Sequence, residues 1–327
     1  MPACSKPRPR APLAMLLIAA SALTPALAQT PSPIADGKPL TLPATLEAGL
    51  FYLHPKLPDG RALRLFSDTG GGLLFTESGA KALGATLDPN ASRERPQRLS
   101  WPRFQADAWI PAPRGSERGV PLMQAPPDQA RHLGDGMLGA NWFGGRSWQF
   151  DYPRGELRLL PANALPRVAA KHRVQLGFQK DADGPTTHFP RIPVRIEGET
   201  LQLLFDTGAS LRLSEQAARE LDGGPNLRAG SFITSEVLKR WRQRHPQWRV
   251  IDKADADGRV RIIEVPQVQI GGYRVGPVWF AERPDKNFHE FMSQWMDRRV
   301  DGAIGGNAFS TLKISVDYPS GVAVFER

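Results

Sequence analysis

Apolar and polar residues alternate along much of the chain in short runs that glycine and proline separate. The pattern predicts a hairpin over residues 265–282, on either side of a Gly-Gly pair, and another over residues 188–208, with its turn at residues 197–199. The 31 glycines and 31 prolines favour short strands over long helices. The sequence therefore predicts a mainly β protein.

One stretch has helical rather than alternating periodicity. Over residues 234–245, Val237, Leu238 and Trp241 fall on one face of a predicted helix that Pro246 ends. Arginine and lysine dominate its other face. Two interpretations stay open: a cap that contacts a substrate or an envelope component, or an amphipathic helix that packs its apolar face on the rest of the domain.

A short motif occurs twice, 138 positions apart, each time after an apolar run. The first copy is LFSDTGGG, residues 65–72, and the second is LFDTGAS, residues 204–210. The alignment continues downstream, where Thr76 and Ser214 are the expected N-caps of two short helices. Each copy therefore predicts a strand, a tight glycine turn, a second short strand and a helix.

A second pair of segments repeats at an offset of 166. DGMLGANWF (135–143) matches DGAIGGNAF (301–309), and a D-Y-P triplet followed by a strand pattern comes after each. The change of offset leaves 28 extra residues in the second half, which predicts a helical insertion around residues 223–250. We interpret the chain as a duplicated module, with lobes at residues 46–165 and 166–327 after an extended lead-in over residues 29–45.

The first 28 residues are typical of a secretory signal peptide. Three cations precede an apolar run over residues 11–23 that is too short to span a bilayer, and Ala-Leu-Ala at residues 26–28 fits a cleavage site. We expect cleavage after Ala28, a periplasmic or secreted protein, and no stable membrane insertion afterwards. The single cysteine, Cys4, would be removed, so packing alone must stabilise the mature chain.

The net charge of the chain excludes few classes of function. The net charge of +9 falls to about +6 without the cations of residues 1–28, and the remaining arginines are spread along the chain. Binding to a polyanion would rest on this charge alone. The described motifs predict no cofactor, no metal site and no nucleic-acid partner.

The duplicated D-T-G motif has a chemical logic of its own. Two carboxyls held close together cannot both ionise, so they share one proton and their pKa values separate. One can then deprotonate a water molecule while the other donates a proton to a substrate carbonyl oxygen. Glycine after the threonine lets the two backbones approach, and the threonine hydroxyls can hydrogen-bond across the pair.

These segments resemble the pepsin/retropepsin family of aspartic peptidases, over most of residues 60–160 and 195–327. The resemblance implies two closed barrels related by a pseudo-twofold axis, in a monomer that hydrolyses polypeptides without metal or cofactor. It implies a catalytic dyad, a threonine grip between lobes and two tight turns. The corresponding residues are Asp68 and Asp206, Thr69 and Thr207, and Gly70 and Gly208.

Three departures from the family pattern leave an alternative open. Ser67 stands where an apolar residue usually precedes the aspartate, and Gly71 and Ala209 lack the hydroxyl that would favour an ionised carboxylate. We therefore expect a less acidic pH optimum than that of digestive pepsins. Trp101 and Trp109 are candidates for covering the cleft or for ordinary packing. The alternative is an inactive relative that binds peptides or an envelope partner.

Overall fold

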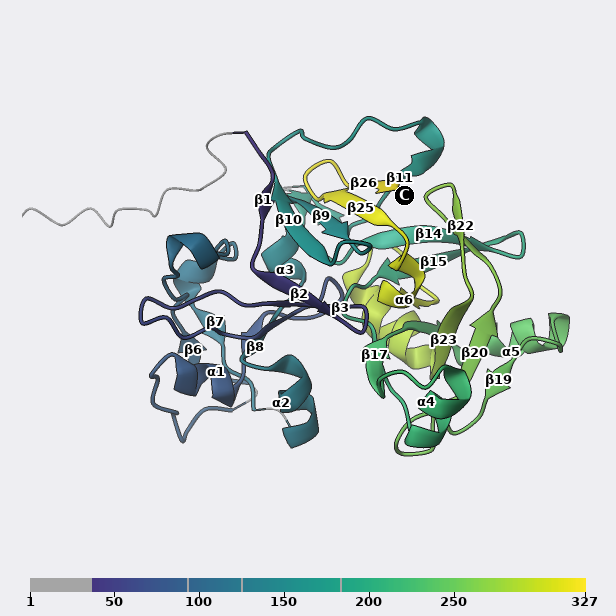
Figure 1. The fold of residues 1–327 in the computed structure, drawn as a ribbon, viewed down its shortest axis with the longest axis horizontal. Helices are drawn as coiled ribbons and strands as arrows, with labels where there is room; N and C mark the ends of the chain where they lie inside the picture. The colour runs from purple at the N-terminus through teal and green to yellow at the C-terminus, as the bar shows by residue number, and fades with distance from the viewer. Residues whose placement is uncertain (1–36, 93, 125, 183) are drawn as a thin grey trace, which may run out of the picture. The chain divides into compact units, whose positions relative to one another are not determined.

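Three large β-sheets contain most of the strands of the described chain, which is residues 37–327 except 93, 125 and 183 in a computed structural model of the protein. One sheet comes from the first sequence repeat, one from the second, and one from both (Figure 1). The mainly β prediction is confirmed. The expected signal peptide and cleavage site, and residues 29–36 of the lead-in, lie outside the described residues.

The sheets of the two repeats differ in size. The smaller has the order β2 (Ala44–Glu47), β3 (Leu50–Leu53), β4 (Leu65–Ser67), β8 (Gly136–Leu138) and β5 (Leu74–Phe75). The larger has the order β19 (Val250–Ile251), β20 (Ile262–Val265), β23 (Val278–Arg283), β18 (Ser231–Thr234), β24 (Gly302–Ile304), β15 (Glu199–Phe205), β14 (Arg191–Ile196), β21 (Val268–Ile270) and β22 (Tyr273–Val275). Both orders have two ends in the described chain, so the expected closed barrels are not confirmed.

The centre of each sheet repeats the same pairing. Strand β4 runs parallel to β8 with Leu65 opposite Gly136, and β15 runs parallel to β24 with Leu203 opposite Gly302. These partners are related by the two sequence offsets, 138 and 166. The repeated sequence thus forms the same two-strand unit twice, with the D-T-G motif directly after the first strand of each unit.

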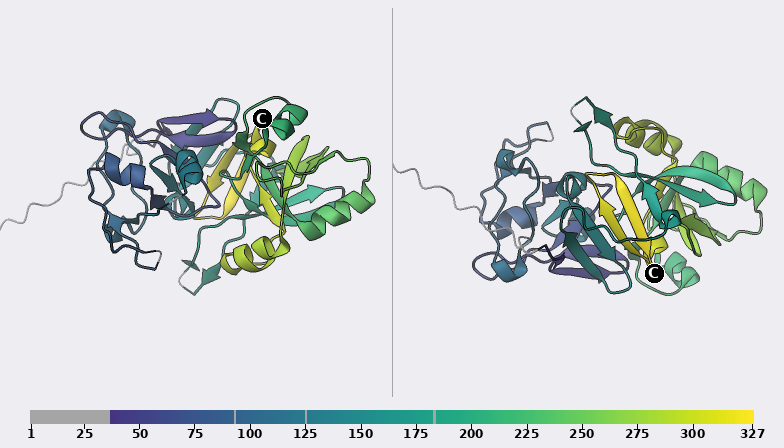
Figure 2. Two further views of the ribbon diagram at one scale, coloured as in Figure 1. Left: turned by 90° about the horizontal axis from the view of Figure 1, so that it is seen from below. Right: turned by 90° about the horizontal axis from the view of Figure 1, so that it is seen from above.

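The third sheet joins strands from both repeats, and Figure 2 shows it between the elements of the two halves. At its centre, Ser147 pairs with Asp317, and Asp151 pairs with Lys313. Ser147 is equivalent to Lys313 in the repeat, and Asp151 to Asp317. The pairing is therefore reciprocal, with Gln149 and Ser315 at its middle. The amide of Gln149 donates a hydrogen bond of 3.0 Å to the Ser315 hydroxyl. Its order is β1 (Leu40–Thr41), β10 (Glu156–Leu160), β9 (Ser147–Asp151), β25 (Lys313–Asp317), β26 (Val322–Glu326) and β11 (Arg173–Gln175).

The predicted local elements are confirmed. The hydroxyls of Thr76 and Ser214 accept N–H bonds at the starts of α1 (Glu77–Ala82) and α4 (Glu215–Leu221). The hairpin β14–β15 lies where alternation predicts it. The hairpin β21–β22 is shorter than predicted, over residues 268–275, because β23 pairs instead with β20 and β18. Helix α5 (Ser235–Arg244) fills the predicted helical stretch. The other helices are α2 (Pro127–Leu133), α3 (Ala140–Phe143), α6 (Gly306–Phe309), the 3-10 helices Ala106–Ala108, Ser116–Arg118, Ala170–His172 and Ser293–Trp295, and the π-helix Asn287–Met292.

Several strands lie where the sequence did not predict them. Strands β1 and β2 begin within the expected lead-in, whose described part is extended and belongs to two sheets. The insertion around residues 223–250 holds strands as well as α5. Three small sheets complete the list: β6 (Arg98–Leu99) with β7 (Val120–Pro121), β12 (Lys180–Asp181) with β13 (Gly184–Pro185), and β16 (Ser210–Arg212) with β17 (Leu227–Ala229). Within the described residues, no helix combines the length and apolarity needed to cross a bilayer.

Candidate functional site

The two D-T-G aspartates occupy the same place in their repeats. Asp68 follows β4 and its backbone N–H donates a 3.0 Å hydrogen bond to the carbonyl of Leu138; Asp206 follows β15 and donates a 3.0 Å bond to Ile304. Each carboxylate also accepts a bond from the backbone N–H two residues later, at 2.9 Å from Gly70 and 3.0 Å from Gly208. The strands that begin at the glycine of each D-G motif, β8 and β24, therefore hold the turns that carry the aspartates.

A pair of threonines links the two turns. The hydroxyl of Thr69 donates a 2.7 Å hydrogen bond to the carbonyl of Phe205 and accepts a 2.9 Å bond from the N–H of Thr207. The hydroxyl of Thr207 accepts a 3.2 Å bond from the N–H of Thr69. Both threonines are fully buried. The structure thus brings together the residues that the sequence analysis grouped as a dyad and its grip.

Glycine is required where each turn meets the carboxyl of the other. A Cβ added to Gly70 would lie 2.5 Å from Cγ of Asp206, and one added to Gly208 would overlap Cγ of Asp68. Real Cβ contacts are never this close, so any side chain here would push the carboxyl aside. The two turns therefore approach to a distance that only glycine allows.

The pKa values of both aspartates are raised above the ordinary value. Burial is the largest cause that raises the pKa of Asp206 well above its ordinary value, and the charge of Asp68 and a hydrogen bond to it raise the pKa further. Burial also raises the pKa of Asp68, while hydrogen bonds from Asp206 and from the backbone act to lower it. Two neighbouring carboxyls whose pKa values are both raised can hold one proton between them.

Two buried tyrosines near the aspartates escaped the sequence analysis. Tyr152 and Tyr318 belong to the repeated D-Y-P triplets, and neither hydroxyl has a hydrogen-bond partner among the described residues. Burial raises the pKa of both phenols, and the field of Asp206 adds to the shift at Tyr152 and that of Asp68 at Tyr318. The repetition of D-Y-P was the signal that could have marked them as neighbours of the dyad.

The three residues that depart from the family pattern all lie in confined surroundings. A Cβ on Gly71 would overlap a carboxylate oxygen of Asp68, so this turn leaves no room for a hydroxyl-bearing side chain. Ala209, at the equivalent position, is buried. Ser67 is completely buried, and its hydroxyl has no hydrogen-bond partner in the described chain. The first turn is therefore more restricted than the second.

Trp101 and Trp109 lie between the strands β6 and β7, and both are partly buried against the main hydrophobic core. The ring of Trp101 stacks 6.0 Å from that of Phe75 and contacts Phe104 edge-on at 5.8 Å. These contacts are those of packing residues. A role for either tryptophan in covering a cleft stays a prediction.

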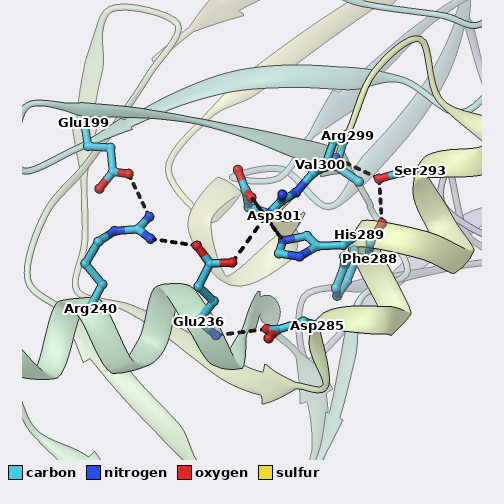
Figure 3. Close-up of polar contacts among 10 residues, drawn as sticks. All are labelled: Glu199, Glu236, Arg240, Asp285, Phe288, His289, Ser293, Arg299, Val300 and Asp301. Atoms are coloured by element: carbon cyan, nitrogen blue, oxygen red, sulfur yellow. Dashed lines mark hydrogen bonds and ion pairs between the residues drawn. The ribbon is translucent and has the colours of Figure 1, made fainter.

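The basic helix α5 packs as the amphipathic interpretation expects, with Val237, Leu238 and Trp241 buried. Arg240 lies between Glu199 of β15, at 2.7 Å, and Glu236 of its own helix, at 3.6 Å. Figure 3 shows this chain of charges continuing from Glu236 to Arg299, at 3.3 Å, beside Asp301 of the second D-G motif. Some basic side chains of the helix therefore form ion pairs within the protein.

The described residues contain no candidate metal site beside the aspartate pair. No three His, Cys, Asp or Glu side chains in this part of the chain are grouped as a metal site requires.

The 480 Å³ pocket bounded by Leu73, Leu87 and Met123 is mainly apolar, and a 400 Å³ pocket runs along Ser210–Leu213. The second pocket begins four residues after Asp206.

Comparisons with known proteins assign the chain to no family. No family model matches the sequence, and no curated protein matches it. Among solved structures, the chain is similar to an aspartic proteinase from Irpex lacteus, at 9% sequence identity, over 88% of this chain and 97% of that chain, with a TM-score of 0.49. The identity and the TM-score of this match are too low to assign a function to the chain.

The glycine contacts predict a difference between neighbouring glycines of the first turn. Gly70→Ala should lower the free energy of unfolding by about 1–3 kcal/mol, because its Cβ must displace the Asp206 carboxyl. Gly72→Ala is the matched control: its nearest neighbour would be Cε of Met137 at 3.9 Å, so it should change stability by less than about 0.5 kcal/mol. Denaturant titration measures both, and equal effects would contradict the close approach of the turns.

The raised pKa of Asp206 predicts how stability depends on pH. Between about pH 4 and that raised pKa, the folded protein holds a proton that the unfolded chain has released, so stability falls as pH rises. Asp206→Asn removes this titration, and its stability relative to the wild type should increase from pH 4 to pH 7. Unfolding free energies at several pH values measure the difference. A difference that is constant with pH would show that the Asp206 pKa is not raised.

Proposed function

We propose that this protein is an aspartic endopeptidase that hydrolyses peptide bonds with a water molecule activated between Asp68 and Asp206. The observation that carries the proposal is the close placement of two carboxyls, one from each repeat, that have raised pKa values and are held together by the threonine bridge. A purely structural role would not need two turns whose glycines touch the opposite carboxyl.

In the proposed reaction the two carboxyls have different roles. The ionised Asp68 takes a proton from the water as its oxygen attacks the carbonyl carbon of the substrate, and Asp206 donates its proton to the carbonyl oxygen. As the C–N bond of the tetrahedral intermediate breaks, Asp68 donates the proton taken from the water to the nitrogen of the leaving amine, and Asp206 takes a proton back from the hydroxyl that becomes part of the product carboxyl. The dyad returns to one shared proton, and no cofactor enters the balance.

The same proposal includes the finer organisation expected from the sequence. The reciprocal pairing of β9 with β25, and the identical registers of β4–β8 and β15–β24, support two lobes related by a pseudo-twofold axis. Both aspartates lie in one chain, which supports a monomer that acts on polypeptides. We place the protein in the periplasm or outside the cell, after cleavage at Ala28.

Asparagine substitutions test the reaction. Asp68→Asn and Asp206→Asn should each lower kcat for cleavage of a denatured protein by about 10²–10⁴-fold, because each removes one of the two proton-transfer groups. Asp59→Asn, which changes an exposed aspartate of the same half, is the control and should keep full activity. A pepstatin-like transition-state mimic should block the wild type.

Two outcomes would overturn the proposed function. Either asparagine variant could keep full activity, which would remove the dyad from the chemistry. The purified mature protein could also cleave nothing between acidic and neutral pH, and the peptide-binding alternative would then replace the peptidase.

The pH optimum is a separate prediction. Burial raises the pKa of both aspartates, and neither Gly71 nor Ala209 offers a hydroxyl that would lower it. Activity should therefore peak above about pH 2, and Ala209→Ser should move the acidic limb of the pH–rate profile to lower pH. A wild-type peak at or below about pH 2 would contradict this account of the site.

A further inference from the structure

His132 lies at the end of helix α2, between the two segments that carry the aspartates, and the proposed chemistry does not use it. Its Nδ1 lies 3.0 Å from the hydroxyl of Tyr52, and its Nε2 lies 3.4 Å from the hydroxyl of Ser210. Its ring centre is 4.3 Å from that of Phe66. One side chain therefore has three separate contacts, on two ring nitrogens and one ring face.

These contacts reach both of the segments that the dyad depends on. Phe66 belongs to β4 and stands two residues before Asp68, while Ser210 begins β16 and stands four residues after Asp206. The threonine bridge holds the turns themselves. His132 holds the chain on the upstream side of one turn and on the downstream side of the other.

The surroundings fix the imidazole ring and keep it neutral. The guanidinium of Arg64 lies 3.5 Å from the centre of the Tyr52 ring and pairs with Glu47 at 2.8 Å, so the tyrosine is itself held. Burial, then Arg212 and Arg64, lower the pKa of His132 to about 4. A neutral ring donates from one nitrogen and accepts at the other, and hydroxyl partners satisfy either arrangement.

We propose that His132 is a positioning residue that fixes the segment after Asp206 against the strand before Asp68, and so sets how the two carboxyls face each other. The proposal rests on the proposed peptidase function for its catalytic consequence. Its structural consequence, a more mobile segment 206–210 without His132, does not depend on that function. A displacement on the order of 1 Å between catalytic groups can cost about 100-fold in rate.

Three substitutions at this position separate its two hydrogen bonds. In His132→Gln the side-chain amide reaches the place of Nε2 and keeps the bond to Ser210, whereas in His132→Asn the shorter amide reaches only the place of Nδ1 and Tyr52. His132→Ala keeps neither. His172→Ala is the matched control, because His172 has a ring contact, with Tyr273 at 4.2 Å, and a polar contact at Nδ1, 2.8 Å from the carbonyl of Gly271, but touches neither aspartate segment through them.

The first measurement is steady-state cleavage of a peptide by the full mature protein. His132→Ala and His132→Asn should lower kcat by about tenfold or more with KM within about twofold, and His132→Gln should recover most of kcat. His172→Ala should keep the kcat of the wild type. Equal kcat in the Gln and Asn variants, or no loss in the Ala variant, would overturn the proposal.

The second measurement is amide hydrogen exchange over residues 203–213, which needs no activity. Exchange there should be about tenfold faster in His132→Ala and His132→Asn than in the wild type, and unchanged in His172→Ala and His132→Gln. Unchanged exchange in all variants would overturn the positioning role. If the wild type cleaves no peptide, the proposed function fails, while the exchange result still decides whether His132 holds the segment.

Discussion

The close approach of two glycine turns is the constraint on which the rest of the structure depends. Gly70 lies against the carboxyl of Asp206 and Gly208 against that of Asp68, and the threonine bridge fixes this distance. At such a separation, in a buried site, two ionised carboxylates would repel strongly, so one proton stays with the pair. The reciprocal pairing of β9 with β25 provides the rigid frame, because it registers the two halves of the chain against each other.

Local features of the fold could be predicted from the sequence because the repeat carries them. Thr76 and Ser214 cap equivalent helices, and the two D-G segments pair with the two D-T-G strands in the same register. Each of these depends on residues close in sequence or on one parallel strand pair. For the same reason, the dyad, its threonines and its glycines could be named before their geometry was known.

Long-range and irregular features could not be predicted. In the six-stranded sheet, β9 and β25 pair residues 162 to 170 positions apart, and no local periodicity indicates that these strands will meet. His132 gives no signal in the sequence, because its partners, Tyr52 and Ser210, lie 80 and 78 residues away. The restriction at Gly71 also becomes visible only where the turn meets Asp68.

The most direct test of the central claim is a titration of the aspartate carboxyl carbons by NMR in the folded wild-type protein, followed from pH 2 to pH 8. The shared proton predicts that the signals of Asp68 and Asp206 respond to each other, and that one of the two carboxyls stays protonated well above the ordinary aspartate pKa of about 3.9. Two independent titrations near that ordinary value would contradict the account.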